Sequence, residues 1–152
     1  MALLMAGCAA VPTPTAPPPR PAPTPAPAPA PLPTPGKSWE DRAVDPGGWR
    51  YDAGSRTATF APSGSANPLL TMSCAGGGIR LTSALDGNVA LRTSAGTDQI
   101  RFEGGSATVP SRDVRLDRIA FSRGRFALES PSGALTLPVQ SEIGRVIEDC
   151  RG

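Results

Sequence analysis

The chain has 152 residues, with 19 prolines, 17 glycines, no histidine and a formal net charge of +2. Thirteen of the prolines lie between Pro12 and Pro35, so about 115 residues remain to fold, which suits one domain with a single core. The charges form no cluster of the size that nucleic-acid binding requires, and the lack of histidine removes the commonest general base and metal ligand.

The first ten residues, MALLMAGCAA, are apolar or small and include Cys8. This run is far shorter than the roughly 20 residues that a transmembrane helix needs. The stretch Leu4-Met5-Ala6-Gly7-Cys8 resembles a bacterial lipobox, the cleavage site of lipoprotein signal peptides. The resemblance implies that Cys8 is acylated and holds the protein in a lipid bilayer. Because Ala9 follows Cys8 where inner-membrane lipoproteins have aspartate, it also implies the periplasmic face of the outer membrane.

A complete signal peptide has a basic region and about 7–15 apolar residues, whereas seven uncharged residues precede Cys8. We therefore expect that translation starts upstream and that residues 1–8 are the remnant of an export signal. The alternative is a chance match, with Cys8 a lone cysteine in a flexible tail.

Residues 9–38 are rich in proline and alanine. They contain too little apolar surface to offset the entropy of ordering, so we expect a disordered tether. Repeated X-Pro favours polyproline II at about 3.1 Å per residue, which gives a reach of roughly 90 Å. A proline-rich docking ligand is the alternative to this spacer.

Residues 39–152 contain short alternating runs between turn signals, which predict antiparallel strands. Pairing Trp49 with Phe60, and Tyr51 with Ala58, places all four side chains on one face. The type I turn signal Ser130-Pro131-Ser132-Gly133 likewise sets Leu128 opposite Leu135.

Three further turns are predicted between these hairpins. A turn at Ala75-Gly76 sets Met72 opposite Ile79 and directs Cys74 inward. A three-residue loop, Asp86-Gly87-Asn88, sets Leu85 opposite Val89. A two-residue turn at Gly104-Gly105 sets Phe102 opposite Ala107.

Two helices are expected among the strands. Asp113 is a suitable N-cap for a short helix near 113–122, which Gly124 would end. Helical spacing of apolar residues after Pro138 predicts a C-terminal helix near 139–150 that lies on the sheet. The predicted fold is therefore mainly β, a small antiparallel sandwich or rolled barrel with these two helices.

If Cys8 carries lipid, Cys74 and Cys150 remain, and both fall on predicted inward faces. An even number of cysteines in an exported domain indicates a disulfide, so we expect these two to be bonded. A pair of buried free thiols is the alternative.

No constellation of catalytic or metal-ligating residues is evident, and neither a cofactor nor a metal is expected. Glycoside hydrolysis requires a pair of carboxylates, and four are candidates: Asp98, Glu103, Asp113 and Glu129. Their spacing in the sequence does not favour any pair. Arg123 and Arg125, on either side of Gly124, are candidate ligands for a carboxylate or phosphate. Alternatively, Arg123 complements the helix dipole and Arg125 occupies the outer face of a strand.

The domain also resembles a family of small alphaproteobacterial envelope proteins, chiefly from sphingomonads, for which no activity is established. Four stretches of sequence carry the resemblance: GWRY at 48–51, LTMSC at 70–74, LDRIAFSRGRF at 116–126 and EIGRVIEDCR at 142–151. It covers most of the domain and implies export from the cytoplasm.

We therefore expect a membrane-anchored lipoprotein of the cell envelope, acting as a non-enzymatic binding or structural module. Its partners would be the bilayer, through acylated Cys8, and an envelope protein or glycan, with no role for nucleic acid. The alternative is a carboxylate-based hydrolase that acts on an envelope glycan.

Overall fold

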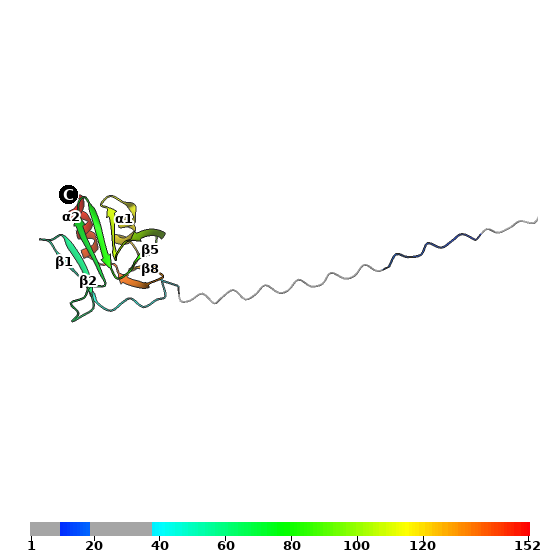
Figure 1. Cartoon of the computed structure of the whole chain (residues 1–152), viewed down its shortest axis with the longest axis horizontal. Coiled ribbons are helices and arrows are strands. Elements are labelled where there is room, and N and C mark those ends of the chain that lie inside the picture. The colour runs from blue at the N-terminus through cyan, green and yellow to red at the C-terminus, as the bar shows by residue number, and fades with distance from the viewer. Residues whose placement is uncertain (1–9, 19–37) are drawn as a thin grey trace, which may run out of the picture. The chain divides into compact units, whose positions relative to one another are not determined.

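The structure, a computed structural model, describes residues 10–18 and 38–152. Residues 10–18 have no helix or strand and are exposed to solvent. Residues 38–152 form the folded part of the chain (Figure 1). The lipid attachment predicted at Cys8 and most of the predicted tether lie outside the described residues.

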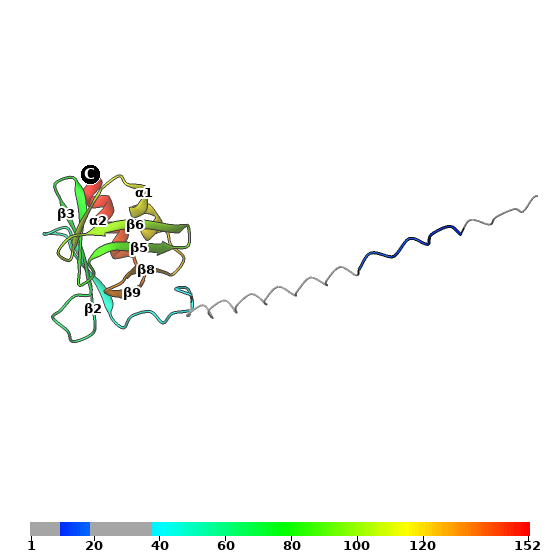
Figure 2. The same ribbon diagram turned by 45° about the vertical axis from the view of Figure 1, so that its right-hand side comes forward.

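Within residues 38–152, nine strands form two antiparallel sheets, and two helices follow the seventh and ninth strands. The first sheet has the order β1 (Gly48–Asp52), β2 (Thr57–Ala61), β3 (Leu70–Ala75), β4 (Gly78–Ser83), β7 (Ser106–Pro110). The second, seen side by side in Figure 2, has the order β6 (Gly96–Phe102), β5 (Gly87–Thr93), β8 (Arg125–Ser130), β9 (Gly133–Pro138). The helices are α1 (Val114–Ala120) and α2 (Ser141–Arg151). The predicted mainly β class is confirmed, in a sandwich-like arrangement of two sheets rather than one rolled sheet.

The first and last predicted hairpins are confirmed residue for residue. Trp49 faces Phe60 across β1 and β2, and their rings meet edge to face with centroids 5.5 Å apart. Leu128 faces Leu135 across β8 and β9. In both hairpins the alternation of apolar residues and the turn signal specify the same register.

The predicted pairing of Met72 with Ile79 is wrong by two residues. Met72 faces Leu81, and Ile79 faces Cys74, because the turn lies at Gly76-Gly77 rather than Ala75-Gly76. Both of these glycines have positive φ, which a two-residue type I′ hairpin turn requires. A shift of two leaves every side chain on its predicted face, so Cys74 still points inward.

The predicted loop Asp86-Gly87-Asn88 is also wrong, because β4 and β5 belong to different sheets. Gly87 begins β5 and faces Phe102 of β6, so Leu85 and Val89 are not paired. Strand β4 already has neighbours on both sides, β3 and β7, and the chain crosses between sheets after Ser83.

The Gly104-Gly105 turn is found, but it joins strands of different sheets. Glu103 and Ser106 form a single bridge around it, and both glycines have positive φ. The expected pairing of Phe102 with Ala107 is absent, since Phe102 faces Gly87 and Ala107 faces Leu81. The two glycines are therefore enough to predict that the chain reverses direction here. They do not predict which strands pair with β6 and β7 on either side of the turn.

Both helices occur close to their predicted positions. Asp113 caps α1 by accepting a hydrogen bond from the backbone N–H of Arg115 at 2.9 Å, and the helix ends at Ala120 rather than 122. α2 begins at Ser141 rather than 139, because the backbone of Gln140 is extended (φ −134°, ψ 167°) and makes it the N-cap. The buried residues of α2, Ile143, Val146 and Ile147, belong to the same core as the inward faces of the sheets. In the described ranges, no helix has the length and apolarity needed to cross a membrane.

Candidate functional site

A disulfide joins the end of β3 to the last turn of α2. It links Cys74 to Cys150, the predicted pair, with 5.3 Å between their Cα atoms. At the other end of α2, the indole N–H of Trp49 donates to the carbonyl of Pro138 at 2.8 Å. The helix is therefore attached to the first sheet near both of its ends, which fixes the surface that it presents to α1.

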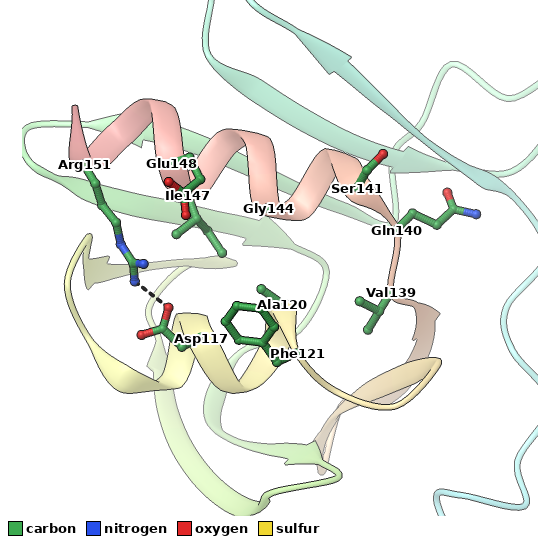
Figure 3. A pocket seen from close by; sticks show the side chains of 10 residues that line it. All are labelled: Asp117, Ala120, Phe121, Val139, Gln140, Ser141, Gly144, Ile147, Glu148 and Arg151. Atoms are coloured by element: carbon green, nitrogen blue, oxygen red, sulfur yellow. Dashed lines mark ion pairs between the residues drawn. The ribbon is translucent and has the colours of Figure 1, made fainter.

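The two helices enclose a groove of about 410 Å³ (Figure 3). Its apolar lining comes from both helices, the C-cap of α1 and a residue two positions before α2: Ala120, Phe121, Val139, Gly144 and Ile147. Gly144 contributes no side chain, and a Cβ placed there would meet nothing within 4 Å. The groove is therefore open over the middle of α2, where a larger residue would occupy it.

Phe121 stands at the rim of this groove with 81% of its surface exposed. Its backbone is held in place as the C-cap of α1, where its N–H donates to the carbonyl of Asp117 at 2.9 Å. Leu116 and Ile119 of the same helix are fully buried. An exposed phenylalanine on a fixed backbone, beside an apolar groove, is a residue of the aromatic type that is enriched in protein interfaces.

An ion pair closes one end of the groove, as the dashed line in Figure 3 shows. Arg151 of α2 contacts Asp117 of α1 at 2.8 Å, and its Nε donates to the carbonyl of Ser111 at 2.7 Å. At the other end, Gln140 is the N-cap of α2 but its side chain makes no capping hydrogen bond. The groove thus has an apolar middle and polar ends, a pattern typical of binding clefts.

The four candidate carboxylates are each held by different arginines. The pairs are Asp98 with Arg118, Glu103 with Arg101, Asp113 with Arg115, and Glu129 with both Arg42 and Arg92. Hydrogen bonds from the Arg115 side chain lower the pKa of Asp113, against the effect of partial burial. Burial raises the pKa of Glu129, but the hydrogen bonds from Arg92 and Arg42 outweigh it and the pKa is lowered. A general acid for glycoside hydrolysis needs the opposite shift.

Arg123 and Arg125 line one shallow hollow, but they are not equivalent. The guanidinium of Arg125 donates to the backbone carbonyls of Glu40 at 3.1 Å and Arg42 at 2.7 Å. Arg125 therefore holds the segment before β1 against β8. Arg123 is exposed, and its backbone N–H donates to the Ser94 hydroxyl at 3.0 Å. The contacts of Arg125 could not be predicted from the sequence, because the two carbonyls lie more than 80 residues before it.

Sequence reasoning did not single out Phe121, although one signal was present. Phe121 is out of phase with the helical spacing of Leu116 and Ile119, so it does not fall on the buried side of the helix.

Within residues 10–18 and 38–152, no group of three or more Cys, Asp or Glu side chains is placed to hold a metal ion. Comparison with protein-family models, with curated proteins and with solved structures gives no match to this chain.

Proposed function

We propose that the protein is a lipid-anchored, non-enzymatic binding protein of the cell envelope, whose groove between α1 and α2 receives an apolar side chain of a partner protein. The observation that carries this proposal is the exposure of Phe121 at the rim of an apolar groove. Exposing a large apolar side chain does not help the chain to fold, and burying it against a partner gains about 1.5–3 kcal/mol.

Export and anchoring are supported by the cysteines and the composition of the chain. Cys74 and Cys150 form a disulfide, a bond typical of oxidising compartments outside the cytoplasm. The remaining cysteine, Cys8, lies in the stretch that resembles a lipobox, and a proline-rich segment separates it from the domain. A lipid at Cys8 would keep the groove near the membrane, and the segment between them would set how far it reaches.

The non-enzymatic part of the proposal is supported by the ion pairs of the candidate carboxylates. Asp113 and Glu129 have lowered pKa values, so both are charged near neutral pH and hold arginines rather than protons. A hydrolase needs a carboxyl group that keeps its proton near neutral pH, so the ion pairs of Asp113 and Glu129 favour a binding protein over a hydrolase.

Site-specific photocrosslinking in the envelope of the native host tests the groove. A photoreactive phenylalanine analogue at Phe121 is expected to capture a discrete protein adduct. The same analogue at Val114, which is 56% exposed on α1 but does not line the groove, is the matched control. Equal labelling at both positions, or no adduct at Phe121, would contradict the proposed site.

Intact mass analysis of the protein from its own membrane fraction tests the anchor separately. We expect a chain that begins at Cys8 and carries a triacyl group, and a Cys8→Ser variant that leaves the membrane fraction. An unlipidated chain would refute the anchor while leaving the groove to be judged by crosslinking.

A further inference from the structure

The outer face of the first sheet carries two rows of polar residues across its five strands, most of them threonine or serine. Residues that alternate with the buried positions form this face, and the strand register places them directly opposite one another. The first row, from β1 to β7, is Arg50, Thr59, Thr71, Thr82 and Ser106. The second is Asp52, Thr57, Ser73, Arg80 and Thr108.

Most of the hydroxyl groups in these rows are available to a ligand. Of the hydroxyls in these two rows, only that of Thr57 makes a hydrogen bond within the described part of the chain, to the carbonyl of Ser55 at 3.1 Å. The other hydroxyls offer both a donor and acceptors. Neighbouring strands are about 4.8 Å apart, so each row crosses about 19 Å of surface.

Two arginines give this face a positive character. Arg50 stands at one end of the first row and Arg80 lies within the second, and both are exposed. Neither makes an ion pair with any residue of the described ranges. The one carboxylate in the rows, that of Asp52, accepts hydrogen bonds from the backbone N–H and the hydroxyl of Ser55.

Hollows lie at both edges of the same face. Arg50 and Thr59 line two of them, of about 560 and 490 Å³. A third, of about 330 Å³ at the β7 edge, is lined by Arg80, Ser106 and Thr108, together with Glu103 and its ion-pair partner Arg101. Strand propensity alone favours threonine on an exposed sheet face, whereas the unpaired arginines and the hollows beside them point to a ligand.

We propose that the outer face of the first sheet binds an anionic polysaccharide strand that lies across β1, β2, β3, β4 and β7. The rows of hydroxyls hydrogen-bond to sugar hydroxyls, and Arg50 and Arg80 bind acidic groups along the glycan, as guanidinium groups bind carboxylates in a bidentate manner. This face contains none of the residues that line the helix groove, so the inference does not depend on the proposed protein partner.

Calorimetric titration of the full chain with soluble oligogalacturonate, a carboxylated glycan, tests the proposal. Maltooligosaccharide of equal length is the neutral glycan, and polyphosphate is the polyanion without sugars. We expect binding to oligogalacturonate that clearly exceeds binding to either of the others. No binding to oligogalacturonate, or equal affinity for polyphosphate, would overturn the proposal.

Three sets of variants locate the site. R50Q/R80Q is expected to lose about tenfold or more in affinity, because it removes two charge-assisted contacts. The matched control, R112Q/R145Q, removes two exposed arginines that lie outside the rows and should change affinity less than about twofold. Equal losses in these two variants would show a general charge effect and refute the site.

The variant T59V/T71V/T82V removes three hydroxyls of the first row with little change in side-chain shape. Valine is well tolerated in strands, so we expect a melting temperature at least as high as that of the parent chain. Oligogalacturonate affinity should nevertheless fall several-fold. An unchanged affinity in this folded variant would refute the role of the hydroxyl row.

Discussion

Asp45 and Thr136 exchange two hydrogen bonds at the open edge of the second sheet. The backbone N–H of Asp45 donates to the carbonyl of Thr136 at 2.7 Å, and the N–H of Thr136 donates to the carboxylate of Asp45, also at 2.7 Å. Thr136 lies in β9, the last strand of the sheet, and it is only 1% exposed. The segment before β1, residues 39–46, thus pairs with backbone groups of β9 that would otherwise be left unpaired at the edge of the sheet.

Asp45→Ala should destabilise the domain by about 1–3 kcal/mol, because it leaves the buried N–H of Thr136 without an acceptor. Asp45→Asn keeps a side-chain acceptor and should cost less. Urea denaturation measures both, with Asp41→Ala as the control at an exposed aspartate of the same segment. If Asp45→Ala and Asp41→Ala have equal effects, the side chain of Asp45 contributes nothing to closing the edge.

The turn between β6 and β7 offers a matched pair of glycines. Both have positive φ, but a Cβ at Gly105 would lie 2.6 Å from the carbonyl oxygen of Ser83, whereas one at Gly104 would meet nothing within 4 Å. Gly104→Ala should therefore cost only the left-handed backbone penalty of about 1–2 kcal/mol. Gly105→Ala should cost about 1–3 kcal/mol more through overpacking. Thermal melting of the two variants tests this order, and the reverse order would show that the contact with Ser83 is easily relieved.

The disulfide should contribute a large share of the domain's stability. Cys74 and Cys150 are 76 residues apart, and closing a loop of that length is worth about 4–5 kcal/mol in the chain-entropy model. In a Cys8→Ser background, we expect a reducing agent to lower the melting temperature markedly. The same agent should leave a Cys74→Ser/Cys150→Ser variant unaffected. A parent chain that melts at the same temperature with and without reductant would contradict the expected contribution.

Acid should weaken the domain partly through Glu129, which links Arg42 to Arg92. Its pKa is lowered in the folded state, so ionised Glu129 stabilises the fold above its ordinary pKa near 4.5, and this stabilisation is lost as the pH falls through the lowered value. Denaturant titrations between neutral and acidic pH should show a smaller loss of stability in Glu129→Gln than in the parent.

The control for this pH effect is Glu103→Gln. The side chains of Glu103 and its partner Arg101 are 77% and 67% exposed, and ion pairs at such surfaces contribute little. The pH dependence of Glu103→Gln should therefore follow that of the parent chain. If Glu129→Gln follows it equally closely, the ion pairs of Glu129 have no net effect on folding.

Features of the chain that depend on neighbouring residues were predictable. Asp113 caps α1 because its carboxylate reaches an N–H two residues later, and the pairing of Trp49 with Phe60 follows from a short turn between alternating runs. The pairing of Met72 was misplaced by two residues, because a side-chain period of two is equally satisfied by either register.

The amino-acid sequence by itself determined the alternating strands, both helices, the inward position of both domain cysteines and the turns at Gly104-Gly105 and Ser130–Gly133, because these depend on local backbone preferences and alternation. Only the tertiary structure decided that β4 pairs with β7 rather than β5, that Arg125 binds carbonyls of residues 40 and 42, and that Phe121 stands beside an open groove. A strand edge accepts any partner with suitable alternation, so the choice of neighbour is made by which inward faces bury each other best across the whole domain.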